Sequence, residues 1–257
     1  MNADDASKPL DHVGGALAAA ARDLDLRSSA GRSIARMADL PALSHRQLAE
    51  RRMIHRDGSA RPFADAFREI RTRLLALGGD ENFVTMVAAV SPGSGASFVA
   101  RNLAAAFAFD EAKTALLIDC NPRYASQHKA LGTEASPGLV DYLDHPSMGI
   151  ESILHRTGIP RLRVIPSGKS SETSGEYFSS FRMRAAIDSM RCRYPDRYLF
   201  LDGPPVKGSP DARILSDLAD FVVLVAGYGR DTPAAIAQAA SSFDPARLAG
   251  IVFDELP

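Results

Sequence analysis

Several features that define common protein classes are scarce in this sequence. Two cysteines among 257 residues, Cys120 and Cys192, are too few for a disulfide framework or a cysteine-rich zinc site, and we expect both to be buried thiols. The apolar runs, such as residues 221–225, are far shorter than the roughly 20 residues that span a bilayer. A formal net charge of −1 provides no basic field for nucleic acid, so we expect no such partner. Because the first residues are acidic and no apolar signal core follows them, we expect a cytoplasmic location.

The composition changes near residue 62. Residues 1–62 have almost no aromatic or β-branched side chains, so this segment is predicted to be largely disordered or loosely helical, with short helical stretches near residues 15–26 and 45–53. It serves either as a solvated tether or as a docking segment for a partner. Residues 63–75 show helical spacing of apolar side chains, at Phe63, Phe67, Ile70 and Leu74. We therefore predict a folded domain over residues 63–257.

After residue 79, short apolar runs alternate with segments of helical character. The predicted strands are 83–90, 115–118, 162–165, 198–201, 221–225 and 250–253, and the predicted helices are 98–109, 176–192 and 233–242. Buried apolar strands that alternate with helices predict an α/β fold of the P-loop NTPase type, a doubly wound, mostly parallel sheet with helices on both faces. Ligands of such sheets bind at the carboxyl ends of the strands.

A glycine-rich loop follows the first predicted strand. Residues 91–97 read Ser-Pro-Gly-Ser-Gly-Ala-Ser. Glycines at such a turn let successive backbone N–H groups converge on an anion, and the helix that follows adds the positive end of its dipole. A Walker A loop has a lysine where this chain has Ala96, and that lysine reaches the terminal phosphates during phosphoryl transfer. The loop therefore keeps the backbone half of a phosphate site and lacks the side-chain half.

Two further motifs place a carboxylate at a strand end. Residues 116–123 read Leu-Leu-Ile-Asp-Cys-Asn-Pro-Arg, and residues 199–205 read Leu-Phe-Leu-Asp-Gly-Pro-Pro. In P-loop sites such a carboxylate holds the water shell of magnesium, next to a Ser or Thr hydroxyl on the metal. If magnesium is retained, we predict that it lies at Ser97, Asp119 and Asp202. The predicted nucleotide-binding residues are Gly93, Ser94, Gly95, Ala96, Ser97 and Phe98.

Taken in order, the three motifs resemble those of the bacterial tyrosine kinases, cytoplasmic P-loop kinases and related proteins of capsular and exopolysaccharide synthesis and export. The likeness runs from about Phe63 to Asp254. Members of that family carry Pro-Gly-Glu-Gly-Lys-Ser-Thr, Asp-x-Asp-x-x-Arg and Asp-Thr-Pro-Pro motifs. The helix at 65–72 is similar to the family's Glu-x-x-Arg-x-x-Arg self-association motif, which implies an interface at Asp65, Arg68 and Arg71. The alternative is an ordinary amphipathic helix packed on the core.

The departures from the family pattern concern chemistry. Ala96 replaces the lysine, Phe98 replaces a small hydroxyl residue beside the α-phosphate, and Asn121 replaces the second acid of the middle motif. The resemblance thus implies that Asp119 and Asp202 are vestigial catalytic residues. Arg101 is expected to face a neighbour or solvent rather than phosphate. All five lysines lie outside the loop, and Lys207 is expected at the surface: Lys8, Lys113, Lys129, Lys169 and Lys207.

The family's kinases also phosphorylate a cluster of tyrosines in a C-terminal tail. The six tyrosines of this sequence are scattered, and none clusters near its end, so we expect the acceptor tail to be missing as well.

Three functions remain open. The favoured one is a pseudokinase of polysaccharide export that binds the cytoplasmic tail of a membrane polysaccharide copolymerase, at the inner membrane, and self-associates through the 63–75 helix. The second is a weak ATP- or ADP-binding protein that uses magnesium and retains slow hydrolysis or kinase activity. The third is a partitioning or division-site ATPase, which the missing lysine and the absence of a C-terminal membrane-targeting helix disfavour.

Overall fold

The alternation of apolar side chains along each strand builds a sheet that is covered on both faces. In β1 (Val84–Ala89), Val87 and Ala89 pack into one hydrophobic core, while Met86 and Ala88 pack into a second core on the opposite face. Every residue of this strand is buried. Such continuous burial is typical of parallel strands with helices on both sides.

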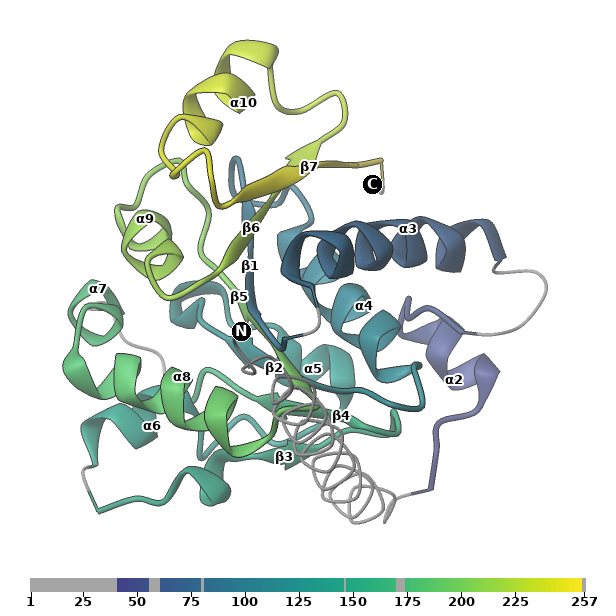
Figure 1. The fold of residues 1–257 in the computed structure, drawn as a ribbon, viewed down its shortest axis with the longest axis vertical. Helices are drawn as coiled ribbons and strands as arrows, with labels where there is room; N and C mark the ends of the chain where they lie inside the picture. Colours follow the sequence, from purple (N-terminus) through teal and green to yellow (C-terminus); the bar gives the residue numbers. More distant parts are fainter. Residues whose placement is uncertain (1–40, 56–60, 80, 146, 170–173, 256–257) are drawn as a thin grey trace, which may run out of the picture.

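The computed structural model describes residues 41–55, 61–79, 81–145, 147–169 and 174–255 (Figure 1). Within these ranges, seven strands form one sheet in the order β3-β4-β2-β5-β1-β6-β7, in which the β3–β4 pair is antiparallel and the other pairs are parallel. This confirms the predicted fold class. The strands are β1 (Val84–Ala89), β2 (Thr114–Asp119), β3 (His155–Arg156), β4 (Leu162–Ile165), β5 (Arg197–Asp202), β6 (Phe221–Gly227) and β7 (Leu248–Asp254).

The helices form a layer on each face of the sheet. Side chains of α2, α3 and α4 enter the first core, and side chains of α6, α8, α9 and α10 enter the second. Figure 1 shows the two groups on opposite sides of the strands. The helices are α2 (His45–Glu50), α3 (Arg61–Gly78), α4 (Ala96–Ala108), α5 (Gln127–Leu131), α6 (Leu139–Asp144), α7 (Ser174–Phe178), α8 (Phe181–Arg193), α9 (Asp211–Ser216) and α10 (Pro233–Ala240), with single 3₁₀ turns at Pro122–Tyr124 and Ile150–Ile153.

Three details differ from the sequence-based expectation. The helix predicted over 176–192 is two helices, because the hydroxyl of Ser180 accepts a hydrogen bond from the amide of Met183 and starts α8 there. The two-residue strand β3 was not predicted, since it is too short to show a period. Cys120 is buried as expected, whereas Cys192 is exposed near the end of α8.

The chain before α3 also packs on the domain where the structure describes it. Met53 and Ile54, which follow α2, are each 1% exposed. The buried side chain of Asn102 in α4 accepts a hydrogen bond from the Ile54 amide at 2.8 Å and donates to the Arg52 carbonyl at 3.1 Å. Residues 1–40, most of the segment predicted to be loosely ordered, lie outside the described residues. The domain boundary at residue 63 therefore stays a prediction.

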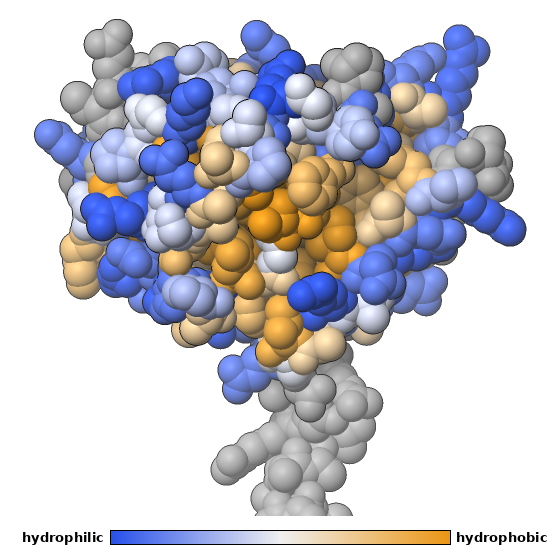
Figure 2. Space-filling model, turned by 90° about the horizontal axis from the view of Figure 1, so that it is seen from above, coloured by the Kyte–Doolittle hydropathy of each residue, from blue (hydrophilic) through white to orange (hydrophobic). Residues whose placement is uncertain are grey.

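The surface beside the edge strand β7 is partly apolar. Ile251 and Phe253 of β7 are exposed, and Figure 2 shows apolar side chains gathered in a shallow hollow, with polar side chains around it, on the side of the molecule where β7 and α10 lie. Within the described ranges, no helix combines the length and the apolar character that crossing a membrane requires.

Candidate functional site

Three neighbouring strands bring the three sequence motifs together at one edge of the sheet. β2, β5 and β1 are adjacent, and Asp119 at the end of β2 is paired in register with Asp202 at the end of β5. The glycine-rich loop connects β1 to α4, which begins at Ala96. The sequence predicted this meeting of strand ends correctly.

The glycine-rich loop has the backbone shape of an anion cradle. Gly93 and Gly95 have φ angles of +83° and +91°, a region that side chains other than glycine rarely adopt. A side chain at Gly95 would also collide with the carboxylate of Asp254. No side chain caps α4, and hydrogen bonds within the described chain provide no acceptor for the amides of Ala96 and Ser97. These N–H groups at a helix N-terminus suit a phosphate.

A segment far away in sequence holds this loop in place. Asp231, which follows β6, accepts hydrogen bonds from the hydroxyls of Ser91 and Ser94, the latter at 2.7 Å, and from the Gly227 amide at 2.8 Å. Arg230 donates to the carbonyl of Gly93 at 2.7 Å. Burial raises the pKa of Asp231, but the hydrogen bonds from Ser91, Ser94 and Gly227 outweigh it, so that the pKa lies below the ordinary value. We call Arg230 and Asp231 the loop clamp.

Asp119 is occupied by the backbone of its own loop. Its Oδ1 accepts from the amide of Asn121, and its Oδ2 accepts from the amides of Ser126 and Gln127, each at 3.1 Å. Burial raises the pKa of Asp119, and these three N–H groups oppose the rise. The structure therefore gives this carboxylate a definite role in shaping the 121–127 loop.

Asp202 is fully buried and only half paired. Its Oδ2 accepts a hydrogen bond from Nε2 of Gln127 at 2.6 Å, while its Oδ1 is buried without a partner. The same Gln127 amide donates to the carbonyl of Ser97 at 2.9 Å. Burial, and then the charge of Asp119, raise the pKa of Asp202 to about 7. Gln127 therefore links the second and third motifs to the loop.

The residues fit magnesium only in part. Mg²⁺ in phosphate sites uses one or two carboxylates together with ligand oxygens. The Asp202 carboxylate and the Ser97 hydroxyl are close enough to interact, and the Oδ1 atom of Asp202 is free to face an ion or its water. Asp119 has both oxygens engaged. In the described part of the chain, no group of three or more His, Cys, Asp and Glu residues forms a metal site by itself. The predicted magnesium set of Ser97, Asp119 and Asp202 stays a prediction.

A cavity of about 600 Å³ opens beside the loop. Its lining includes Gly93, Gly95, Ala96 and Ser97 of the predicted phosphate site, while Ser94 is buried under the loop with its hydroxyl bonded to Asp231. The remaining lining residues are Ala89, Pro92, Phe98, Arg101, Asn121, Tyr124, Gly203 and Pro205.

Two side chains of α4 lie differently from the simplest expectation. The ring of Phe98 stacks on Phe63 and meets Phe67 edge-on, at centroid distances of 5.7 and 6.2 Å, so that it joins α3 to the cavity wall. Arg101, which was expected to face a neighbour or solvent, lines the cavity. Lys207 does not line this cavity; it lines a neighbouring hollow together with Asn121 and Tyr124.

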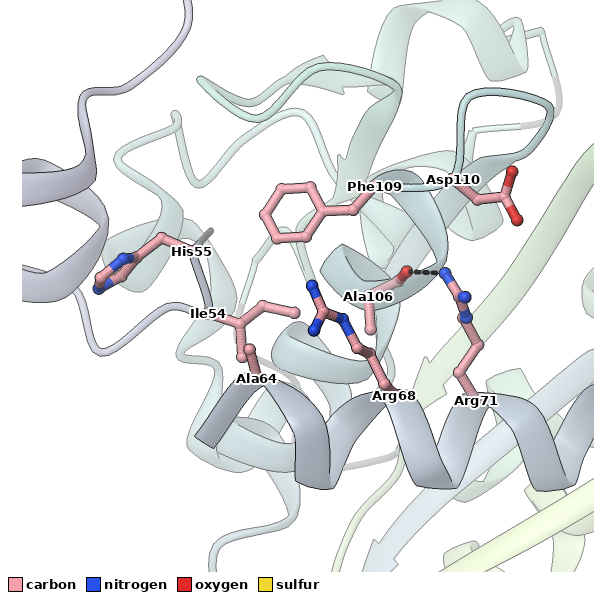
Figure 3. A pocket seen from close by; sticks show the side chains of 8 residues that line it. All are labelled: Ile54, His55, Ala64, Arg68, Arg71, Ala106, Phe109 and Asp110. Atoms are coloured by element: carbon pink, nitrogen blue, oxygen red, sulfur yellow. Dashed lines mark hydrogen bonds between the residues drawn. The ribbon is translucent and has the colours of Figure 1, made fainter. Parts of the chain in front are cut away.

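The arginines of the possible self-association helix have unequal environments. Figure 3 shows both on α3, beside a pocket of about 240 Å³ that Ile54, Phe109 and other residues line. Arg71 donates to the carbonyl of Ala106 at 3.0 Å and so ties α3 to α4. Arg68 pairs with Asp65 on the same helix at 2.6 Å, and both side chains are more than half exposed. Of the three predicted interface residues, Asp65 and Arg68 are thus exposed to solvent, whereas Arg71 is held against α4. The interface stays a prediction.

Sequence reasoning missed four residues of this site: it directed Arg101 away from the phosphate site, and it had no signal for Gln127, Arg230 and Asp231. Gln127 and Arg101 lie near recognised motifs but belong to none. Arg230 and Asp231 are about 140 residues away from the loop that they contact. The Asp that precedes a Thr N-cap and a Pro, at 231–233, reads by itself as a helix start.

Comparisons with known proteins agree with the arrangement. No protein-family model matches the chain. The putative tyrosine-protein kinase EpsB of Ralstonia solanacearum is 33% identical over 198 residues, which are 76% of this chain and 26% of that protein. The tyrosine-protein kinase CpsD of Streptococcus agalactiae is 31% identical over 174 residues, which are 66% of this chain and 73% of that protein. The chain therefore spans about a quarter of the length of the first of these relatives.

Solved structures show the same fold. The BceF tyrosine kinase domain superposes with a TM-score of 0.68 and 27% identity, covering 85% of this chain and 92% of that one. The chimerical protein CapA2B2 gives a TM-score of 0.71 at 21% identity, covering 84% and 92%. The cell division ATPase MinD of Pyrococcus furiosus shares the fold alone, with a TM-score of 0.55 and 18% identity over 67% of this chain and 70% of that one. With its three strand-end motifs in order and its identity to CpsD over 73% of that protein, the chain belongs to the family of bacterial tyrosine-protein kinases.

Proposed function

We propose that this protein is a non-catalytic member of its family, a pseudokinase that acts by binding in the synthesis or export of a surface polysaccharide. The observation that carries the proposal is Ala96, which is 6% exposed at the first position of α4, where the family's lysine stands. A methyl group there supplies no charge to a phosphoryl group in transfer.

The surrounding residues support the same conclusion. A base that activates a tyrosine hydroxyl needs a free carboxylate oxygen within reach of that hydroxyl. Both oxygens of Asp119 already accept backbone N–H groups, and Asn121 is an amide where the family's second acid stands. The loop keeps its shape through the clamp from Arg230 and Asp231. The middle motif thus offers no free carboxylate oxygen, while the loop still presents its backbone amides.

The test is an autophosphorylation assay of the purified chain with Mg-ATP, read by phosphotyrosine mass spectrometry, with an active kinase of the family as the positive control. We expect no phosphotyrosine above the level in a sample without ATP. Robust tyrosine phosphorylation of the wild-type chain would show that the proposal is wrong.

As partner we propose the cytoplasmic tail of a membrane polysaccharide copolymerase, which would hold the protein at the inner membrane. This part rests on family resemblance. Affinity purification of the tagged chain from cells that express a tagged copolymerase tests it, and the two proteins should be recovered together. Recovery of the chain without the copolymerase, in a detergent that keeps the copolymerase intact, would contradict it.

Weak binding of ATP or ADP is the second candidate, and the free amides of the loop support it. Calorimetry with millimolar Mg-nucleotide decides, because absence of heat would remove this candidate.

A further inference from the structure

Arg101 is the residue of the loop cavity that the proposed function leaves unexplained. It lies four residues after Ser97 and three after Phe98, and therefore on the same face of α4 as both. Helical side chains lean toward the helix N-terminus. The guanidinium carbon lies 5.2 Å from the centroid of the Phe98 ring, so the charged group lies along the cavity wall one turn from the loop.

Among the described residues, the contact that Arg101 makes through its charge is with the ring of Phe98, and no anionic side chain pairs with it directly. Its Nε atom is buried without a hydrogen-bond partner, and no hydrogen bond or ion pair joins Arg101 to another described residue. Burial lowers the pKa of the guanidinium, and the charges of Asp202 and Asp254 oppose this from a distance. A partly buried cation that lacks an anionic partner is costly unless an anion joins it.

The cavity has the volume and the positive charge that such an anion needs. Among the described residues that line it, Arg101 carries the one charged side chain. The free amides of Ala96 and Ser97 open on the same space. A cavity of about 600 Å³ is in the range of small-ligand sites, and Phe98 and Tyr124 place two aromatic rings in its lining.

We propose that Arg101 supplies the positive charge that Ala96 cannot, and that Arg101 and the loop amides together bind the diphosphate group of a nucleotide. Arginine suits this task because its planar fork of N–H groups matches phosphate oxygens. Its Cα lies about 7.5 Å further along the helix axis than that of Ala96. At this position the guanidinium can stabilise a bound diphosphate, but it does not stay with a terminal phosphoryl group during transfer as the loop lysine does. The inference rests on the proposed function in one respect, that the nucleotide is bound without transfer of its phosphoryl group.

Isothermal titration calorimetry of the full chain with Mg-ADP tests the proposal. The variants are Arg101→Gln, which keeps the stem on Phe98 and removes the charge, and Arg101→Lys, which keeps a charge. Lys207→Gln is the matched control, since it removes a charge from the neighbouring hollow. We expect Arg101→Gln to lose affinity by about tenfold or more, and the other two variants to stay within about threefold of wild type. Equal affinity of Arg101→Gln and wild type, or no binding of Mg-ADP by wild type, would overturn the proposal.

Further titrations identify the group that is bound. AMP should bind at least about tenfold more weakly than ADP, whereas pyrophosphate should retain a dependence on Arg101. Adding Ala96→Lys to Arg101→Gln should restore binding, because the two cations serve the same group. If Arg101→Gln does not fold, as thermal unfolding will show, equal affinity of the wild-type chain for AMP and ADP still overturns the inference.

The two proposals fail in different ways. Tyrosine phosphorylation by the wild-type chain would remove the non-catalytic function and leave Arg101 as a phosphate-binding residue. A chain that neither phosphorylates itself nor binds Mg-ADP would keep the non-catalytic function and remove the role of Arg101.

Discussion

At the scale of single residues, Asp119 and Asp202 show how two carboxylates in register acquire different properties. They are partners on adjacent strands, so each charge disfavours the other. Asp119 accepts three backbone N–H groups, which stabilise its ionised form. Asp202 has no backbone donor, and although the side chains of Gln127 and Ser97 lower its pKa, burial and then the charge of Asp119 outweigh them and raise it to about 7. Of the two carboxylates, Asp119 is therefore the more readily ionised and Asp202 the more readily protonated.

Asp202 should make the unfolding free energy depend on pH. In the unfolded chain an aspartate titrates near pH 4, so between about pH 4 and 7 the folded state binds the extra proton. The stability from this group is complete below pH 4 and is lost as the pH rises through 7. Asp202→Asn removes the titration. In urea unfolding, the unfolding free energy of the variant minus that of wild type should therefore increase by a few kcal/mol, in order of magnitude, from pH 5 to pH 8. A difference between the two proteins that does not change with pH would contradict this.

At the scale of elements, the loop clamp explains how the glycine-rich loop keeps its shape through contacts of its own chain. Asp231, in the segment between β6 and α10, accepts hydrogen bonds from Ser91 and Ser94 of the loop. A charged acceptor makes stronger hydrogen bonds than a neutral one, so the ionised carboxylate matters. The same hydrogen bonds stabilise the ionised carboxylate of Asp231 and so lower its pKa.

Asp231→Asn should destabilise the protein at neutral pH. Loss of the charged acceptor should cost roughly 1–3 kcal/mol of unfolding free energy. Because the folded pKa is depressed, this contribution exists above the ordinary aspartate pKa and disappears as the pH falls through the folded pKa. Wild type and variant should therefore converge in acid. Asp188→Asn, on the exposed side of α8, is the control and should change urea unfolding little at either pH. A variant as stable as wild type at pH 7 would show that the clamp is not stabilising.

At the scale of the whole molecule, two surfaces are candidates for contact between copies. One is the outer face of α3 with Asp65 and Arg68. The other is the apolar surface near β7, an edge strand that exposes Ile251 and Phe253 (Figure 2). Apolar surface of this kind marks an interaction site in many proteins. Arg71 is a poor probe of association, because its bond to Ala106 also holds α3 on the domain.

Light scattering coupled to size exclusion can separate these surfaces. If the protein self-associates through α3, Arg68→Ala should lower the mass in solution at equal concentration, while its unfolding stays close to that of wild type because Arg68 is exposed. Phe253→Asp is the comparison for the β7 surface. An oligomer that survives Arg68→Ala and dissociates in Phe253→Asp would contradict the interface on α3.

Much of the fold and part of the site could be predicted from local pattern. Apolar runs of strand length alternating with helical spacing predict a parallel sheet. Asp119 and Asp202 fall at its carboxyl edge because each ends a strand, and residues 93–97 lie there because their loop leaves the end of β1. The division between α7 and α8 was missed because Ser180 acts as a cap within an otherwise helical pattern.

The amino-acid sequence by itself determined the family, the order of the strand-end motifs and the absence of a lysine at position 96, since these depend on residues adjacent in the chain. Only the tertiary structure decided that Asp231 holds the loop, that Gln127 joins Asp202 to Ser97, and that Arg101 lies in the cavity. Those contacts join segments up to 140 residues apart, or depend on which way a long side chain leans. No local period or spacing carries that information, because it arises only when the sheet packs α4 and the segment after β6 around the same strand ends.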